Sequence, residues 1–156
     1  MRWLDYESDV CSIARALEVL GDRWTILILR ELFNGVHRFD DLHEHLGVSR
    51  DVLTRRLSSL VAEGVVERRA YREPGRRERA DYHLTGSGRE LQPVLISLLT
   101  WGDQHRPAAG GPPVRLEHRD CGAEVGLTLT CAEGHQVRRH DVVTTPLPGA
   151  RLRHAG

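Results

Sequence analysis

One stretch of the chain, residues 49–61, combines charged and hydroxyl side chains in a pattern suited to binding nucleic acid. Its apolar residues recur at i, i+4, i+7 and i+8, which is one face of a helix. The other faces carry cations, hydroxyls and one carboxylate, but no bulky apolar group. Arginine and hydroxyl groups can bond to base edges and to phosphates. The residues of this helix that we expect to contact DNA are Ser49, Arg50, Asp51, Thr54, Arg55, Arg56 and Ser58.

The N-terminal part of such a helix enters the major groove of double-stranded DNA. The candidates for base edges are Arg50, Thr54 and Arg55, and the candidates for phosphates are Ser49, Arg56 and Ser58. Asp51 either accepts a hydrogen bond from the amino group of a cytosine or orients the side chain of Arg55, four residues later in the helix. We favour the second role, because a carboxylate close to phosphate is repelled by it.

A second short helix is predicted directly before this one. Asp40 is a candidate N-cap for a helix over residues 41–46, and Arg38-Phe39 can form only a very short strand. Gly47 suits the position after a helix and Ser49 suits the N-cap of the next one, so the turn is about three residues long. Helix, short glycine-containing turn and helix is the spacing of a helix-turn-helix.

An arginine-rich hairpin is predicted after the two helices. Strand-like runs at residues 65–71 and 80–84 flank a turn marked by Pro74-Gly75. Six of the twelve residues from 68 to 79 are Arg. An ordinary solvated hairpin fits this pattern taken alone, but a basic hairpin directly after a helix-turn-helix is typical of a wing. The wing residues expected to contact DNA are Arg76, Arg77 and Arg79.

Three further helices are expected to hold these elements. The first covers about residues 10–20. The second, residues 23–33 with Asp22 as its N-cap, is apolar on nearly every face, which implies a central helix or one shared with a second subunit. Thr85 caps a last helix, roughly residues 88–104, whose bulky apolar stripe needs a partner surface.

These elements predict an α+β, mainly helical fold: a winged helix-turn-helix domain with a C-terminal dimerisation helix and a small β-rich tail. The predicted boundaries are residues 1–106 for the DNA-binding and dimerisation domain, 107–113 for a linker rich in Pro and Gly, and 114–156 for the tail. Within the tail, residues 114–116 and 125–129 look like short strands.

Charge is unevenly distributed along the chain, although the formal net charge is zero. Residues 1–48 contain 5 Arg and 9 acids, a net charge of −4, whereas residues 49–90 contain 10 Arg and 7 acids, a net charge of +3. The positive charge therefore lies in the predicted DNA-binding stretch. No apolar run approaches the roughly 20 residues of a membrane span, and no signal peptide is recognisable. We expect a cytoplasmic protein without a membrane partner.

Several runs of residues between positions 11 and 102 form a specific combined pattern, in order and correctly spaced. They are Cys11, Ala16–Leu32, Arg38–Leu42, Val52–Leu57, Leu60–Arg68, Tyr82–Gly88 and Trp101-Gly102. This pattern resembles the HxlR-type winged helix-turn-helix regulators, within the wider MarR-like group of bacterial transcription factors. The resemblance implies a homodimer that binds a (pseudo)palindromic operator and represses or activates nearby genes. It does not cover the segment after the linker.

Cys11 stands where members of that family often carry a redox- or electrophile-reactive cysteine. The start of a helix can lower the pKa of a thiol, although acids nearby oppose this effect. A small, inert hydrophobic residue is the alternative for Cys11.

The tail contains two His and Cys pairs, His118-x-x-Cys121 and Cys131-x-x-x-His135. Their spacing resembles that of a small zinc ribbon. We favour an eroded ribbon or a plain hairpin, because nine His residues make chance pairs common, and we assign no metal ligand and no cofactor.

The combined features predict a sequence-specific DNA-binding transcriptional regulator, a homodimeric repressor on a palindromic operator. Gating by a small-molecule effector or by thiol oxidation stays open, and the helix over residues 23–33 could line an effector pocket. The alternative is a regulator that acts mainly through protein contacts of its tail and binds DNA weakly. We predict no enzyme, because the sequence contains no nucleophile elbow, phosphate-binding glycine loop, His-Glu-x-x-His motif or convincing carboxylate pair.

Overall fold

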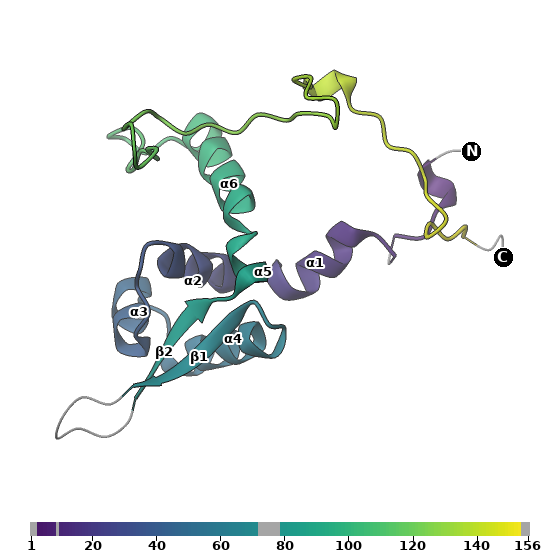
Figure 1. Ribbon diagram of the computed structural model, residues 1–156. Coiled ribbons are helices and arrows are strands. Elements are labelled where there is room, and N and C mark those ends of the chain that lie inside the picture. Colours follow the sequence, from purple (N-terminus) through teal and green to yellow (C-terminus); the bar gives the residue numbers. More distant parts are fainter. Residues whose placement is uncertain (1–2, 9, 72–78, 154–156) are drawn as a thin grey trace. The chain divides into compact units, whose positions relative to one another are not determined.

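The computed structural model describes residues 3–8, 10–71 and 79–153 (Figure 1). The chain divides into two units, the first comprising residues 1–91 and 146–156 and the second residues 92–145. The elements of the first unit are η1 (Trp3–Asp5), α1 (Ser12–Leu20), α2 (Arg23–Phe33), α3 (Phe39–Leu46), α4 (Arg50–Ala62), β1 (Val66–Tyr71), β2 (Arg79–Leu84) and α5 (Gly86–Arg89). The second unit contains α6 (Gln92–His105) and the short 3-10 helix η2 (Arg139–Asp141).

Side-chain caps fix where three of the helices begin. The Asp22 carboxylate accepts hydrogen bonds from two amides in the first turn of α2, at 2.9 and 3.4 Å. Ser49 caps α4 through a bond of 3.4 Å from the Val52 amide, and Thr85 caps α5 in the same way. Each such cap stabilises its helix by about 1 kcal/mol. The predicted caps at Asp22 and Ser49 are confirmed, and Thr85 is an N-cap as predicted, although of the short helix α5.

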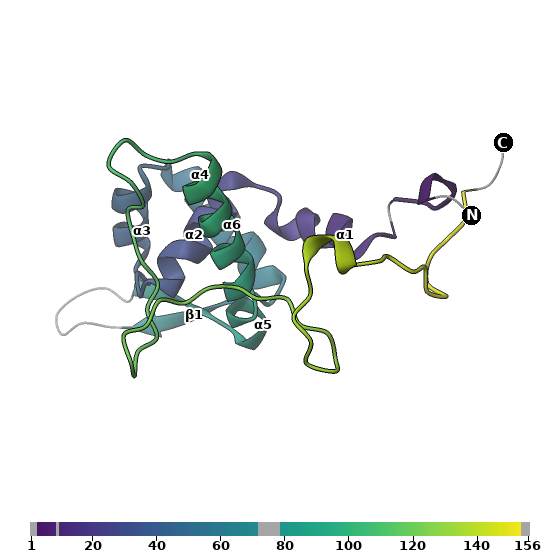
Figure 2. The same ribbon diagram turned by 90° about the horizontal axis from the view of Figure 1, so that it is seen from above.

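α2 forms the centre of the core of the first unit. It contacts α1, α3, α4 and β2, and it lies between α3 and α1 in both ribbon views (Figures 1 and 2). Ile28 and Leu29 are completely buried, and Leu32 is nearly so. The predicted bounds of this helix and its central position are confirmed. The remaining core residues are Leu42, Val48, Leu53, Leu57, Leu60, Val66 and Leu84.

β1 and β2 form an antiparallel hairpin that is anchored at its base. The register pairs Val66 with Leu84 at the base and Tyr71 with Arg79 at the far end. Val66 and Leu84 are buried, whereas the middle of β1 is exposed. Only the base of the hairpin therefore belongs to the core. The predicted turn at Pro74-Gly75 lies outside the described residues.

The start of α3 differs from the prediction. The helix begins at Phe39, so Asp40 lies in its first turn and is not the N-cap, and Arg38 occupies that position without a side-chain cap. A carboxylate in the first turn still complements the helix dipole. Arg38 forms an isolated bridge with Asp81 of β2, which is all that remains of the predicted short strand.

The single last helix predicted over residues 88–104 is wrong, because the chain forms α5 and then α6. Pro93 has no amide hydrogen to donate to the carbonyl four residues earlier, so α5 cannot continue through it. Proline fits well in the first turn of a new helix, which is where it lies in α6. A Cβ atom on Gly88 would lie 2.2 Å from the Val65 carbonyl oxygen, so the close packing of α5 on this carbonyl requires glycine.

The tail contains less β structure than predicted. Residues 114–116 and 125–129 do not form strands, and isolated bridges instead join Glu117 to Glu124 and Thr130 to Gln136. Among the described residues from 106 to 145, no side chain is buried. The predicted strands thus lack the apolar neighbours that extended segments need for stable pairing. Farther along, Leu152 pairs with Tyr6 in the first unit, an interaction that the sequence did not indicate.

Two helices expose apolar faces. On α1, Ile13 is 71% exposed and Leu17 55% exposed. On α6, Trp101 is 57% exposed, and Val94 and Leu98 are exposed as well. No helix of the described residues is long and apolar enough to cross a membrane.

Candidate nucleic-acid interface

The turn between α3 and α4 presents the N-terminus of α4 at the surface. Gly47 ends α3 with a φ of 62°, a left-handed conformation that glycine adopts without strain. α4 packs its leucines into the core against α2, so its opposite face points to solvent. The predicted contact residues on that exposed face are Ser49, Arg50, Asp51, Thr54, Arg55 and Ser58.

Asp40 of α3 joins two of the arginines predicted to contact DNA. Its carboxylate accepts from Arg50 of α4 at 2.8 Å and lies 3.7 Å from the guanidinium of Arg79 in β2. All three side chains are about half exposed. The Arg50 guanidinium also lies 5.5 Å from the ring centre of Phe39. The fold thus brings a residue of the recognition helix and a residue of the wing to one point, although 29 positions separate them in the sequence.

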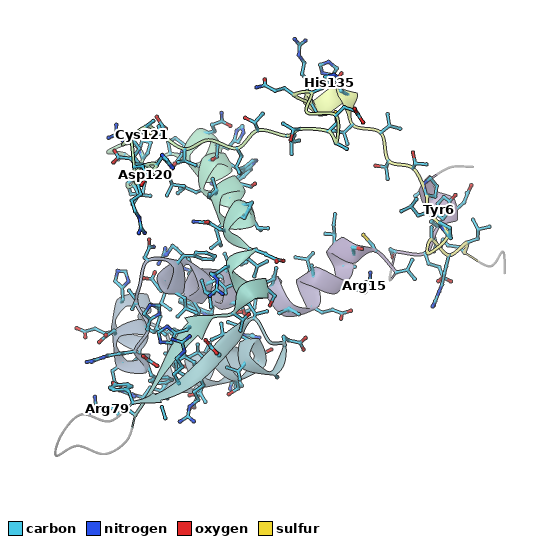
Figure 3. All side chains as sticks on the ribbon, viewed as in Figure 1. Tyr6, Arg15, Arg79, Asp120, Cys121 and His135 are labelled. Atoms are coloured by element: carbon cyan, nitrogen blue, oxygen red, sulfur yellow. The ribbon has the colours of Figure 1, made fainter. Side chains whose placement is uncertain are left out.

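Figure 3 shows Arg79 at the beginning of β2, where the described part of the wing starts again. Arg68 and Arg69 are exposed on the neighbouring strand, and Arg69 forms an ion pair with Glu67. Arg76 and Arg77, the other predicted wing contacts, lie outside the described residues. The described strands of the wing therefore carry exposed basic groups, and one of them, Arg79, lies beside the N-terminal end of α4 through Asp40.

Arg56 lies on a different side of α4 from the other predicted contacts. Its guanidinium donates to the Asp22 carboxylate at 2.7 Å, and this carboxylate also caps α2. The contact fixes α4 against the start of α2. Asp51 and Arg55 are both exposed, and within the described residues no ion pair joins them.

A buried carboxylate on α2 holds α3 in place. Glu31 is 1% exposed and accepts from Nδ1 of His45 in α3 at 2.8 Å, as well as from Arg30. Buried carboxylates require such partners, because the charge is otherwise poorly solvated. Since α3 leads directly into α4, this contact also orients the exposed face of α4. No local pattern in the sequence indicates this contact.

Two histidines fasten the base of the wing. The rings of His37 and His83 stack with centroids 4.3 Å apart, and His83 lies 3.0 Å from the carboxylate of Asp81. His37 also bonds to the Tyr82 carbonyl oxygen at 2.9 Å. The segment before α3 is thus tied to β2. Local patterns cannot reveal this contact, because 45 positions separate its partners.

Cys11 occupies the N-cap position of α1, as expected for a cysteine at a helix start. The backbone amides of Ala14 and Ile13 in the first turn lower the pKa of its thiol, although the side chain makes no capping hydrogen bond, and the charge of Arg15 acts in the same direction. Partial burial opposes this effect. The side chain is half-buried, and Cys11 forms no disulfide. The site therefore raises the share of thiolate, the reactive form, above that of an ordinary cysteine.

Comparison with known proteins agrees with this geometry. Residues 19–109, more than half of the chain, match the model of the HxlR-like helix-turn-helix family. An uncharacterized HTH-type transcriptional regulator of Mycobacterium tuberculosis is 41% identical over 145 residues, which cover 92% of this chain and 90% of that protein. That match extends beyond residue 109 into the tail.

Solved structures show the same fold. The crystal structure of PA1607, proposed to be a transcription factor, has a TM-score of 0.75 and 34% identity, and the match covers 86% of this chain and 94% of that one. The redox regulator HypR in its reduced form has a TM-score of 0.55 and 26% identity, over 62% of this chain and 94% of that one. The α+β winged helix-turn-helix prediction is thereby confirmed. The protein is a transcriptional regulator that belongs to the HxlR-like helix-turn-helix family.

Proposed function

We propose that the protein regulates transcription by binding a (pseudo)palindromic operator as a homodimer, with α4 in the major groove and the β1–β2 hairpin as a wing on the neighbouring backbone or minor groove. The observation that carries this proposal is the junction at Asp40, which holds Arg50 of α4 beside Arg79 of β2. Cations of both elements thus face one surface, as contact with one stretch of DNA requires.

The side chains divide into two roles. Arg50, Thr54 and Arg55 lie on the exposed face of α4 and are proposed to bond to base edges. Ser49, Ser58 and the wing arginines are proposed to bind phosphates, which position the protein without reading the sequence. Arg56 would have to leave Asp22 to reach a phosphate. Asp51 is proposed to orient Arg55 once DNA is bound.

A titration of the full chain against DNA from upstream of its own gene tests the proposal. Fluorescence anisotropy is measured at several salt concentrations, with and without unrelated competitor DNA. Binding that resists the competitor and weakens steeply with salt is the expected result. Binding that is equally weak for all sequences would contradict specific recognition.

The exposed apolar faces support the homodimer. Ile13 and Leu17 lie on α1, and Leu98 and Trp101 lie on α6, and large apolar side chains of this kind mark association surfaces. Sedimentation analysis should give a dimer for the native chain and a monomer for Ile13→Asp with Leu17→Asp. A charge placed on the exposed face of α4, Thr54→Asp, is the matched control and should leave the dimer intact.

We propose that the regulator is a repressor whose DNA binding is gated by oxidation of Cys11 or by a small-molecule effector. The lowered pKa of the Cys11 thiol and the likeness to the redox regulator HypR support the first form of gating. A reporter gene placed behind the operator should be silent in the presence of the protein and active after treatment with a thiol oxidant. A Cys11→Ser variant that still responds to oxidant would exclude Cys11 as the sensor.

We keep the division into a DNA-binding and dimerisation domain at 1–106, a linker at 107–113 and a tail at 114–156 as part of the proposal. The alternative, regulation through protein contacts of the tail, predicts that removal of the tail abolishes regulation but not DNA binding. Since Leu152 pairs with Tyr6, deletion of residues 107–156 also removes a contact of the first unit. Deletion of residues 114–145 alone keeps the Leu152–Tyr6 contact, so it is the better variant for this test.

A further inference from the structure

The tail contains two tight turns, and each ends at a glycine with a positive φ. In the first, Gly122 donates to the His118 carbonyl at 2.8 Å and adopts a φ of 69°. In the second, Gly134 donates to the Cys131 carbonyl at 2.9 Å and adopts a φ of 81°. A bridge flanks each turn, between Glu117 and Glu124 and between Thr130 and Gln136. The tail thus contains two small hairpins of different loop length, and each carries one His and one Cys.

Within each hairpin the His nitrogen faces the Cys sulfur. The distance is 3.2 Å between Nδ1 of His118 and Sγ of Cys121, and 3.6 Å between Sγ of Cys131 and Nδ1 of His135. Zinc lies about 2.3 Å from sulfur and about 2.0 Å from nitrogen, so tetrahedral coordination places these two ligands roughly 3.5 Å apart. Each hairpin therefore presents half of a tetrahedral site. Figure 3 labels Cys121 and His135, one from each hairpin.

The first pair also has an outer carboxylate. Nε2 of His118 lies 3.8 Å from the Asp120 carboxylate, on the opposite side of the ring from Cys121. Histidines that bind metals commonly direct their second nitrogen to a carboxylate, which fixes the ring orientation and the protonated nitrogen. Asp120 is placed for that role.

Neither an apolar core nor a disulfide stabilises the described part of this segment. None of the described side chains between residues 106 and 145 is buried, and Cys121 and Cys131 form no disulfide. Val125, Leu127 and Leu129 alternate along one extended run between the hairpins and remain exposed. Small segments without an apolar core are commonly stabilised by a structural metal. Bringing the hairpins together around one ion would cover this apolar row.

We propose that His118, Cys121, Cys131 and His135 bind one Zn²⁺ ion per chain, and that the ion draws the two hairpins into one compact module. Among the described residues, no group of three or more His, Cys, Asp or Glu side chains is placed so that it could hold a metal ion, so the proposal requires that zinc binding and folding of the tail occur together. Zinc binds the thiolate forms, so the protons of the two thiols pass to solvent. No electron transfer is involved.

Titration of the metal-depleted, reduced full chain with Co²⁺ and then Zn²⁺ tests this site. The expected result is the visible absorption of tetrahedral Co²⁺ with a thiolate-to-metal band, saturating at one ion per chain and replaced by Zn²⁺. Cys121→Ser, Cys131→Ser, His118→Asn and His135→Asn should each weaken binding by more than the roughly 10–100-fold typical for loss of an outer partner. Asp120→Asn should show that smaller loss.

Cys11→Ser and His140→Asn are matched controls, since they remove a thiol outside the tail and a tail histidine outside the hairpins. Both should bind metal as the native chain does. Saturation at half an ion per chain would show a site shared by two copies and would overturn the intrachain site, as would full binding by either His variant.

Limited proteolysis of the same samples should show zinc-dependent protection of residues 114–137, and equal cleavage with and without zinc would contradict coupled folding. Neither measurement involves DNA, so the result is independent of the proposed operator binding.

Discussion

The carboxylate of Asp22 links α2 and α4: it caps the first turn of α2 and accepts from the Arg56 guanidinium at 2.7 Å. Because α4 carries the exposed face proposed to read DNA, this contact sets how that face is presented. The Nε of Arg56 is buried and has no partner among the described residues, so the bond to Asp22 is the main compensation for burying this guanidinium.

Replacement of Asp22 should therefore destabilise the domain through two separate losses. Asp22→Ala removes the cap and the ion pair, and we expect it to lower the free energy of unfolding by about 1–3 kcal/mol. Asp22→Ser keeps a capping oxygen and loses only the Arg56 contact, so its loss should be smaller. Urea unfolding of both variants provides the measurement. Equal losses in the two variants would show that the cap contributes little.

Release of the arginines held by Asp40 should strengthen DNA binding. Asp40→Asn removes a negative charge beside the proposed phosphate path and frees Arg50 and Arg79. Since exposed ion pairs contribute about 0.2–1 kcal/mol, affinity should rise roughly 1.5- to 5-fold at low salt. Asp41→Asn, the neighbouring exposed carboxylate, is the matched control and should change affinity less. A lower affinity for Asp40→Asn would mean that Asp40 orients Arg50 for base contact.

Loss of Arg79 in the wing should weaken binding of the protein to all DNA sequences alike. We expect Arg79→Ala to lower affinity for operator and unrelated DNA by the same factor, and to reduce the slope of log K against log salt by about one unit. Arg50→Ala should instead cost about 1–3 kcal/mol at one base position and relax specificity there. Anisotropy titrations on operator variants distinguish the two outcomes. Arg115→Ala, an exposed arginine of the second unit, is the control.

A substitution on the buried face of α4 should lower the stability of the protein, whereas one on the exposed face should lower its affinity for the operator. Leu57 is 1% exposed, so Leu57→Ala should lower the free energy of unfolding by about 2–5 kcal/mol. Thr54→Ala lies on the exposed face and should change stability by less than about 0.5 kcal/mol while reducing operator binding. Chemical unfolding and DNA titration of both variants give the comparison. A stability loss for Thr54→Ala as large as that for Leu57→Ala would contradict the orientation of α4.

The thiol of Cys11 should react at lower pH in the folded protein than in the unfolded chain. The Ala14 and Ile13 amides lower its pKa by stabilising the thiolate. Ionisation thus favours the folded state above the unfolded pKa, and this contribution is lost as the pH falls through the folded pKa. Alkylation rates against pH, measured with Cys121 and Cys131 replaced by Ser, should show a lower midpoint without denaturant than with it. Coincident midpoints would exclude activation by the helix start.

The sequence alone determined the elements whose causes are local. Asp22, Ser49 and Thr85 are N-caps because their oxygens bond to amides within three residues, and Gly47 ends α3 because the turn needs a positive φ. The apolar face of α4 and the continuous apolar surface of α2 predicted their burial. The family resemblance, carried by runs in a fixed order, is confirmed by the match over residues 19–109.

Only the tertiary structure decided which distant groups meet. The junction of Arg50, Asp40 and Arg79, the bond from His45 to Glu31 and the stack of His37 on His83 each join different segments, so no local period reveals them. The tail was predicted to contain short strands at residues 114–116 and 125–129. It forms only paired turns, because the described part of the tail offers no apolar neighbour against which a strand could pack.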